Sequence, residues 1–550
     1  MFRRHFPAAV PNRQLTNMTD ILLIQPPVRD FYLTAKRTIP YGLACIAAVL
    51  ENAGFSVDIF DGLATSKSRT IALPREMAYL EEYYGKPDVS PFALFHHFRH
   101  FGYSFEHIGK IARDSGAFLV GISSLFTAYS DEAIKTAEIV KKFHPECKIL
   151  LGGHHPTAMP ESVMECGAVD FVLRGEGEVT MPLLAEAVKT ENWKPDSIPG
   201  IVFRKRDGTL HISEPAMMED LDHYPLPAMH LVKHSFYRRE RQGSTVIVSS
   251  RGCPMKCTYC SLGSSALKYR RRCVESVLRE IENAVTRYDT GFIDFEDENL
   301  SLDRKWFLKL LNEIRIRFRE YRLELRAMNG LFPPSLDEEM IQKMKDAGFK
   351  TLNLSLGSTS PAQLRKFQRP DVREAVEKVI LLSGKYDLEV VCYVIAGAPD
   401  QNAEDSLADI LYLARKKVLA GISVFYPSPG SADFELSEKA GILPDHFSMM
   451  RSSALPLSHT TSRLESVTIL RLGRIVNFMK SLTDRGMAIS EPSPFRKGDI
   501  TDISDRRKIG KELLGWFLHD GKIRGVTPDG KVFEHNISTE LTKAFISSRR

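Results

Sequence analysis

The first half of the chain alternates short apolar runs with segments of helical spacing. The apolar runs lie at residues 21–24, 57–60, 118–123, 148–153 and 171–175, and the helical spacing at 43–50, 131–143, 160–166 and 179–188. Repeated strand–helix units of this length predict a parallel, doubly wound α/β sheet. Ligands of such sheets bind beyond the carboxyl ends of the strands, where the strand order reverses. We therefore expect a ligand-binding domain over residues 19–195.

A second series of strand–helix units begins at Thr245 and predicts a partial (β/α)6 barrel over residues 243–435. A barrel of this kind carries its site at the carboxyl ends of its strands. Its expected strands are 246–249, 292–295, 324–327, 351–355, 390–395 and 421–425.

The remaining segments lack this alternation. Residues 196–242 are interpreted as a hairpin and linker, because Pro225 and Pro227 interrupt any helix there. Residues 436–550 predict a small, separate α-rich domain with a hairpin, and residues 1–18 an unstructured extension. The aromatic-rich segment 64–116 is too long for an ordinary loop, so we expect a helical insertion. The alternative is a lid over a large cofactor or an apolar substrate.

The bulk composition excludes several classes of protein. The 74 basic and 69 acidic side chains leave a net charge of only +5, which gives no reason to expect a nucleic-acid partner. No apolar stretch approaches the roughly 18 residues of a membrane span. The basic N-terminus lacks the apolar core of a secretory signal. A cytoplasmic protein without a membrane span is therefore expected.

Three of the eight cysteines are clustered directly after an expected strand: Cys253, Cys257 and Cys260, in RGCPMKCTYC. In a long intracellular chain such a cluster indicates a metal site rather than a disulfide. Three thiolates can hold an iron–sulfur cluster and leave one iron open for substrate. The alternative is a structural zinc site with Cys273 or a histidine as fourth ligand. However, no second CxxC or HxxxH pair follows nearby.

CxxxCxxC with an aromatic residue before the last cysteine, at the start of a partial barrel, resembles the radical S-adenosylmethionine superfamily. The resemblance covers about residues 243–435 through YRRRCVESVLREIE, FIDFEDENLSLDR, LNLSLGSTSPAQLRKFQRP, YVIAGAPDQNAEDSL and FYPSPGSADFE. It implies that Cys253, Cys257 and Cys260 bind a 4Fe–4S cluster. The S-adenosylmethionine contacts that it implies are Tyr259, Gly397 and Pro399 near the adenine, Glu296, Asp297 and Glu298 near the amino group, and Ser355 near the ribose.

Two positions depart from the pattern of the relatives. Ser355 stands where the fourth strand of relatives often ends in a glutamate. Asp400-Gln401 stands where relatives often carry Gly-Glu after the fifth strand. Both departures affect the expected ribose and adenine contacts and leave the cysteines intact.

The N-terminal half resembles the cobalamin-binding domain that precedes such barrels in one large subgroup. The matching pieces include ILLIQPP, ILLGGHHPTAMPESVME and VDFVLRGEGEVTMPLLAEA. The residues expected to contact cobalamin are Gln25, Pro26, Ser123, Ser124, Thr127, Gly152, Gly153, His154, Gly175, Glu176 and Gly177. The D-x-H-x-x-G pattern that supplies a cobalt-binding histidine is absent after the first strand, so His154 and His155 remain candidates. The alternative is an α/β scaffold that binds no cobalamin.

The resemblance implies one-electron cleavage of S-adenosylmethionine to a 5′-deoxyadenosyl radical, followed by cobalamin-dependent methylation of an unactivated carbon. A non-methylating oxidation, cyclisation or rearrangement, as in the tetrapyrrole cyclases, is the alternative within the superfamily. A cobalamin- or metal-binding sensor without catalysis is the alternative of another class. The implied partners are a small or large apolar substrate and an electron donor such as flavodoxin or ferredoxin.

Overall fold

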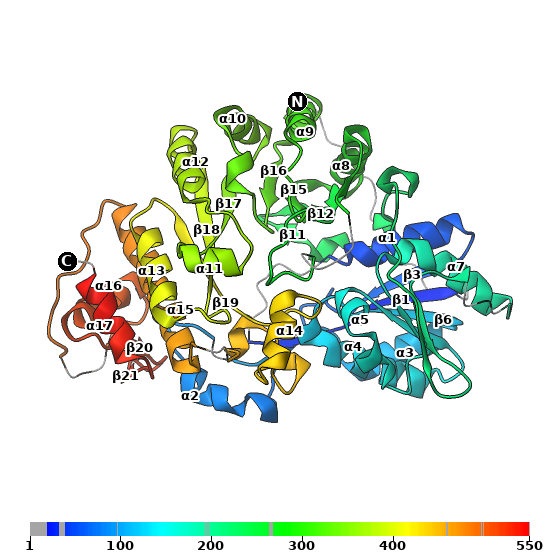
Figure 1. The fold of residues 1–550 in the computed structure, drawn as a ribbon, viewed down its shortest axis with the longest axis horizontal. Coiled ribbons are helices and arrows are strands. Elements are labelled where there is room, and N and C mark those ends of the chain that lie inside the picture. Colours follow the sequence, from blue (N-terminus) through cyan, green and yellow to red (C-terminus); the bar gives the residue numbers. More distant parts are fainter. Residues whose placement is uncertain are drawn as a thin grey trace.

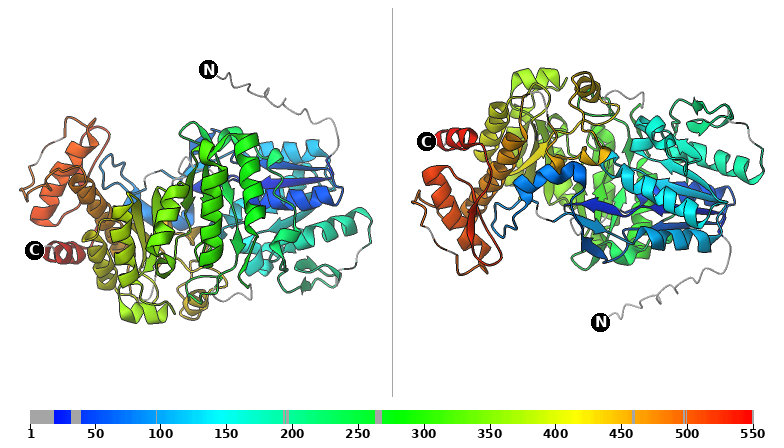
Figure 2. Two further views of the ribbon diagram at one scale, coloured as in Figure 1. Left: turned by 90° about the horizontal axis from the view of Figure 1, so that it is seen from above. Right: turned by 90° about the horizontal axis from the view of Figure 1, so that it is seen from below.

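The computed structural model describes residues 19–31, 39–95, 97–192, 194, 197–262, 268–457, 460–496, 498 and 500–548. The expected extension at 1–18 lies outside these residues. The cobalamin-like domain and the C-terminal helices lie at opposite ends of the molecule, with the barrel between them (Figures 1 and 2).

The N-terminal half is built on a seven-stranded sheet whose central strands are apolar and buried. Strand β1 (Ile21–Gln25) pairs in parallel with β3 (Val57–Asp61) on one side and with β6 (Leu119–Ser123) on the other. The sheet continues through β7 (Lys148–Gly152) and β8 (Phe171–Leu173). The strand order therefore reverses between β1 and β6, as expected for a doubly wound sheet. Ligands of such sheets bind beyond the carboxyl ends of the strands at this reversal.

Helices cover both faces of this sheet because β1 alternates its buried side chains between them. Ile21 and Leu23 pack with α1 (Tyr41–Asn52) and α7 (Gly177–Lys189). The opposite face, with Leu22 and Ile24, packs against a second set: α3 (Phe105–Ser115), α4 (Ser130–Phe143) and α6 (Pro160–Met164).

The hairpin expected between the two domains belongs to the N-terminal sheet. Strand β9 (Ile201–Arg204) pairs antiparallel with β8, and β10 (Leu210–Ile212) continues the edge. Only the following segment connects the domains, ending in β11 (Arg238–Arg239), which pairs with the first barrel strand.

The expected helical insertion contains helical turns together with two short strands, which the sequence did not indicate. Its strands β4 (Ser68–Thr70) and β5 (Arg99–Phe101) form an antiparallel sheet with β2 (Val28–Asp30). Its only α-helix among the described residues before α3 is the short α2 (Glu81–Tyr84), and α3 itself packs against the doubly wound sheet. Between β4 and β5 the chain contacts the C-terminal region, where Arg471 donates to the Tyr83 carbonyl at 3.0 Å. The segment is thus a strap joining two ends of the molecule.

The barrel contains six parallel strands in two hydrogen-bonded groups. The first is β12 (Gln242–Ile247), β15 (Thr290–Phe295) and β16 (Glu324–Ala327); the second is β17 (Thr351–Gly357), β18 (Glu389–Ala396) and β19 (Leu419–Val424). Two isolated bridges, between Leu325 and Phe349 and between Leu331 and Leu354, link them. No pairing joins β12 to β19 among the described residues, so the barrel is open, which confirms the partial barrel. Its helices are α8 (Val274–Tyr288), α9 (Arg304–Arg317), α10 (Glu338–Ala347), α11 (Pro361–Lys366), α12 (Arg373–Lys385) and α13 (Ala403–Ala414).

The C-terminal region shares its core with the barrel rather than forming a separate unit. Helix α15 (Arg463–Thr483) covers the free edge of β19, where Asn477 bonds both the amide and the carbonyl of Ala420 at 2.9 and 2.8 Å. One continuous apolar core joins the barrel to α15 and to the last elements. The last elements are α16 (Arg506–Asp520), α17 (Thr539–Ser547), β20 (Arg524–Val526) and β21 (Val532–Glu534). Helix α14 (Ala432–Lys439) instead lies close to the cysteine loop. No helix in the described parts of the chain is long and apolar enough to cross a bilayer.

Candidate active site at the junction of two sheets

The three clustered cysteines lie on one loop at the carboxyl end of β12. The loop is closed by two short antiparallel strands, β13 (Ser250–Arg251) and β14 (Arg270–Arg271). Burial raises the pKa of Cys253, and negative charge on Cys260 and Cys257 raises it further, so the three thiols are close neighbours. No three metal-binding side chains of the described residues gather around a point that would hold a single ion. Adjacent thiols on one loop fit an iron–sulfur cluster, in which each thiolate binds its own iron.

Arg369 fastens this loop to the barrel and was not anticipated from the sequence. Its Nη1 lies 3.1 Å from the Tyr259 hydroxyl and 3.8 Å from the Cys257 sulfur. Its Nη2 donates to the carbonyl and hydroxyl of Ser355 at 2.6 and 2.9 Å. The buried Nε has no partner among the described residues. Nothing in LRKFQRP distinguishes Arg369 from the exposed Arg365, because only the fold aims one of them at the cysteines.

The three acidic residues after β15 have different roles. Asp297 is 2% exposed and accepts hydrogen bonds from the hydroxyls of Ser249 and Ser250, at 2.7 and 2.5 Å. Burial raises the pKa of Glu296 and of Glu298. The Oε2 atom of Glu298 is buried and lacks a partner among the described residues. The Glu298 carboxylate lies close enough to Cys253 to contribute to the raised pKa of that thiol. Asp297 therefore supports the loop, whereas Glu298 has the unpaired oxygen that an ammonium group could bind.

The turn after β18 explains why Asp400-Gln401 can stand where relatives often carry Gly-Glu. Asp400 adopts a φ of 59°, which glycine adopts without strain and aspartate tolerates. The fully buried Gln401 accepts from the Ala398 amide at 3.0 Å and donates to the Ile395 carbonyl at 3.2 Å, closing the turn. Gly397, at φ 68°, and the buried Pro399 lie within this turn. An apolar cluster brings it to the cysteine loop; its members are Phe367, Ala398, Phe425, Tyr259 and Ile395. The residues expected around the adenine thus come together.

The expected cobalamin contacts at the ends of β1, β6 and β7 lie along one sheet edge. Gln25, Ser123 and Gly152 are the last residues of β1, β6 and β7. The residues beyond these ends are Pro26 after β1, Ser124 and Thr127 after β6, and Gly153 and His154 after β7. Ser124 is 3% exposed and its hydroxyl has no partner among the described residues. Gly153 has φ 128° and ψ −171°, a conformation that is essentially restricted to glycine. A buried unpaired hydroxyl beside a glycine at the strand-order switch fits a bound nucleotide tail.

The two adjacent histidines are in different environments. His155 is 2% exposed, its Nδ1 lies 3.3 Å from the Thr127 hydroxyl, and its ring packs on Phe447. Burial lowers the pKa of His155 to about 4. His154 begins the short helix α5 (His154–Ala158) and is exposed. His155 is therefore a packed, neutral core residue, and His154 remains accessible.

Gly175, Glu176 and Gly177 each pack closely against other parts of the protein. A Cβ on Gly175 would lie 2.2 Å from the Ala216 carbonyl oxygen, and one on Gly177 would lie 2.9 Å from Ile46. The Glu176 carboxylate accepts from the Met218 amide at 2.5 Å and from Arg270 at 2.7 and 3.0 Å. Gly175 stays beside the other expected cobalamin contacts, since its amide donates to the Thr157 hydroxyl of α5 at 2.9 Å, whereas the Glu176 carboxylate is occupied by protein donors.

The cobalamin-like edge and the cysteine loop meet across the turn that follows β19. A Cβ built on Gly430 would lie 3.8 Å from the Ala158 Cβ and 3.9 Å from the Ser261 Cβ. Ala158 ends α5, and Ser261 directly follows Cys260. Tyr426 lies in the same turn and is 43% exposed. It is near enough to Cys260 for that thiol to contribute to the raised pKa of the Tyr426 hydroxyl. The carboxyl ends of both sheets thus converge on one region.

Two family models match the chain in the order of its two sheets. The B12 binding domain family matches residues 34–185, and the Radical SAM superfamily matches residues 247–412. The chain is a radical S-adenosylmethionine enzyme with an N-terminal cobalamin-binding domain. Its cofactors are accordingly a 4Fe–4S cluster, S-adenosylmethionine and cobalamin.

Individual relatives support this membership. The cytidylyl-2-hydroxyethylphosphonate methyltransferase of Streptomyces wedmorensis is 26% identical over 74% of this chain and 78% of that protein. The anaerobic magnesium-protoporphyrin IX monomethyl ester cyclase of Rubrivivax gelatinosus is 28% identical over 59% of each chain. Among solved structures, the radical S-adenosylmethionine methyltransferase TsrM of Kitasatospora setae, with tryptophan and an S-adenosylmethionine analogue bound, has a TM-score of 0.62 and 17% identity. That match covers 90% of this chain and 95% of the other. It shows a shared fold.

Gly153 provides a test of the cobalamin edge. We expect Gly153→Val to reduce the amount of bound cobalamin by at least about 10-fold. A side chain at this φ and ψ is strained and would displace the backbone at Ser124. A Cβ there would lie 2.5 Å from the Ser124 carbonyl oxygen. Cobalt analysis of the purified protein measures the loss, with iron content unchanged. Gly167→Val, where a Cβ meets nothing within 4 Å, is the control. Full cobalamin content in Gly153→Val contradicts the assignment.

Proposed function

We propose that this enzyme transfers a methyl group to an unactivated carbon of its substrate. The observation that carries the proposal is the meeting of the two sheet edges at Gly430, which lies against both α5 and the cysteine loop. A substrate held at this junction lies between the cobalamin edge and the cysteine loop. Relatives named as methyltransferases match over most of the chain, which supports the same conclusion.

When bound, the cluster supplies the electron that cleaves S-adenosylmethionine, and cobalamin supplies the methyl group. The residues of the chain hold and orient these groups. Cys253, Cys257 and Cys260 are proposed to bind the cluster. The unpaired Glu298 oxygen suits the ammonium of S-adenosylmethionine, and the Arg369 guanidinium suits its carboxylate. The apolar cluster around Tyr259 and Ala398 suits the adenine and keeps water out of that side.

The decisive measurement is product analysis after anaerobic reconstitution. The protein is loaded with iron, sulfide and methylcobalamin, mixed with S-adenosylmethionine and a strong reductant, and assayed by mass spectrometry. We expect both 5′-deoxyadenosine and S-adenosylhomocysteine, because methyl transfer consumes a second S-adenosylmethionine. S-adenosylhomocysteine should disappear when cobalamin is omitted. Neither product from cluster-loaded protein would favour a cofactor-binding sensor.

A second candidate is a radical oxidation or cyclisation without methyl transfer. The sequence similarity to magnesium-protoporphyrin IX monomethyl ester cyclases favours it. It predicts 5′-deoxyadenosine without S-adenosylhomocysteine in the same assay. Either reaction requires a low-potential electron donor, and we propose a flavodoxin or ferredoxin of the cytoplasm for this role.

A further inference from the structure

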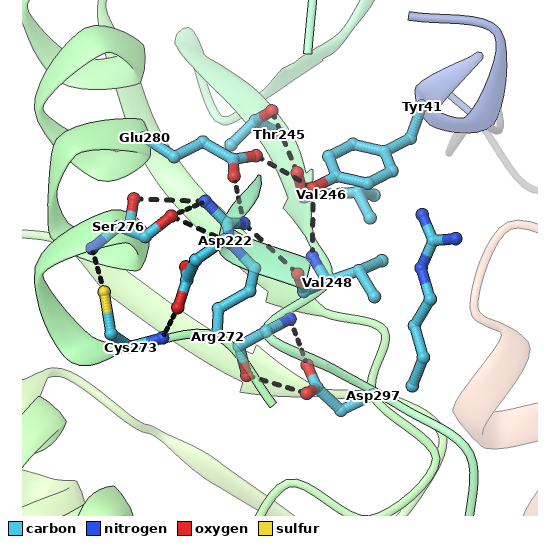
Figure 3. Close-up of polar contacts among 12 residues, drawn as sticks. Tyr41, Asp222, Thr245, Val246, Val248, Arg272, Cys273, Ser276, Glu280 and Asp297 are labelled. Atoms are coloured by element: carbon cyan, nitrogen blue, oxygen red, sulfur yellow. Dashed lines mark hydrogen bonds and ion pairs between the residues drawn. The ribbon is translucent and has the colours of Figure 1, made fainter. Parts of the chain in front are cut away.

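The four residues that lead to the first cysteine are each held by a side chain from another element. The Val248 amide lies 3.4 Å from the Tyr41 hydroxyl of α1, and Ser249 and Ser250 are bonded to Asp297. Arg251 donates to Glu178 at 2.5 Å and lies 3.5 Å from Glu176. The outer pair, Val248 and Arg251, is thus held by the cobalamin-binding domain, and the inner pair by the barrel. Figure 3 shows the contact between Tyr41 and Val248.

The chain is held in a similar way where it leaves the loop. Arg270 forms a two-pronged ion pair with Glu176, at 2.7 and 3.0 Å. Its neighbour Arg271 pairs with Asp303 at 2.9 Å, within the barrel. Arg272 pairs with Glu280 at 2.5 Å, and Glu280 also accepts from Tyr41 at 3.1 Å, as Figure 3 shows. Both ends of the cysteine loop therefore contact the cobalamin-binding domain.

These interdomain ion pairs are shielded from water. The side chains of Glu176 and Glu178 are each 8% exposed, and those of Arg270 and Arg251 are 11% and 24% exposed. The pocket that Glu178, Arg251 and Tyr41 line measures about 40 Å³, which has room for a few waters and none for a corrin ring. Buried, two-pronged pairs of this kind fix geometry, because removing one partner leaves a charge unpaired in the interior.

We propose that Glu176 and Glu178 form a clamp that fixes the cysteine loop relative to the cobalamin-binding domain. Glu176 lies in the turn between β8 and α7, and Glu178 lies in the first turn of α7. Their partners Arg251 and Arg270 lie at the two ends of the loop. These acids are positioning residues: they touch neither cofactor and act through the loop. The inference rests on the proposed function, since methyl transfer requires two cofactors on separate domains to reach one carbon.

The clamp predicts a loss of coupling instead of a loss of cofactors. Glu176→Gln/Glu178→Gln should bind iron and cobalamin at wild-type levels and form 5′-deoxyadenosine within about twofold of the wild type, because the cysteines, Arg369 and Glu298 are intact. The ratio of S-adenosylhomocysteine to 5′-deoxyadenosine should fall by at least about 10-fold, because a displacement of about 1 Å costs as much as 100-fold in rate. The single variant Glu178→Gln, which keeps a hydrogen bond to Arg251, should show an intermediate ratio.

Hydrogen exchange of the cofactor-free protein tests the clamp without catalysis. Amides of residues 248–252 and 270–273 should exchange at least about 10-fold faster in the double variant, because their local opening is less opposed. Arg271→Gln is the matched control: it removes an ion pair from the same strand within one domain and should change neither the exchange at 248–252 nor the product ratio.

The outcomes separate the clamp from the proposed function. Faster exchange in the double variant supports the clamp by itself. This holds even if the wild type forms no S-adenosylhomocysteine and the methyl-transfer proposal fails. Unchanged exchange with lost cobalamin would overturn the clamp and assign the acids to cobalamin. Equal exchange and an equal product ratio in the double variant and the wild type would also overturn it, as would the same changes in Arg271→Gln.

Discussion

Cys257→Ala is expected to lower 5′-deoxyadenosine formation by at least about 100-fold, because two remaining thiolates cannot hold the cluster in place. Cys257 is buried between the other two cysteines of the loop, and its sulfur faces Arg369 at 3.8 Å. Iron and sulfide analysis of the reconstituted protein should fall in parallel. The loss should leave the thermal unfolding of the cobalamin-binding domain unchanged, because none of the loop residues that the structure describes belongs to the core of that sheet.

Cys273→Ala is the matched control for this experiment. Cys273 is exposed, follows β14, and accepts from the Ser276 amide at the start of α8. We expect this variant to retain its iron and its 5′-deoxyadenosine. Loss of bound metal in Cys273→Ala as well, with zinc in place of iron in the wild type, would instead support a structural zinc site. Activity in Cys257→Ala would contradict the assignment of the cluster.

Arg369→Gln is expected to weaken S-adenosylmethionine binding by about 10- to 100-fold, because a charge-assisted hydrogen bond contributes roughly 1.5–3 kcal/mol. The substitution removes the cation that contacts Tyr259 and Ser355 and leaves a polar group of smaller reach. The KM for S-adenosylmethionine in 5′-deoxyadenosine formation, and direct binding to the cluster-loaded protein, measure the effect. Arg369→Lys should recover part of the affinity, since lysine supplies a charge without the two-pronged geometry.

Arg365→Gln is the control for Arg369, because Arg365 lies in α11, four residues before Arg369, and is exposed. It should leave KM unchanged within about twofold, as expected for a surface substitution. An unchanged KM in Arg369→Gln would contradict a role in binding S-adenosylmethionine. A loss of iron in that variant would show that Arg369 acts on the cluster loop through Cys257 instead.

Local patterns in the chain were sufficient to predict both sheets. The strand–helix alternation fixes the period of each unit, and the spacing of Cys253, Cys257 and Cys260 already specifies a shared metal site. The structure of residues 64–116 was harder to predict from the sequence. Its aromatic residues have helical spacing, but the segment contacts residues almost four hundred positions later, such as Arg471. Asp400 adopts a conformation typical of glycine, which accounts for a departure that sequence alone left open.

The sequence by itself determined the order of the two domains, predicted the cysteine ligands and, through its resemblance to a known family, indicated the cofactor class, because the motifs involved lie within short segments. Tertiary structure alone decided which role each of several similar acidic residues has. Glu298 keeps an unpaired oxygen while Asp297 is bonded to serines, and Glu176 pairs with Arg270 across the domain interface. The physical reason is that a carboxylate's role depends on which donors the fold brings within about 3 Å, and those donors come from distant parts of the chain.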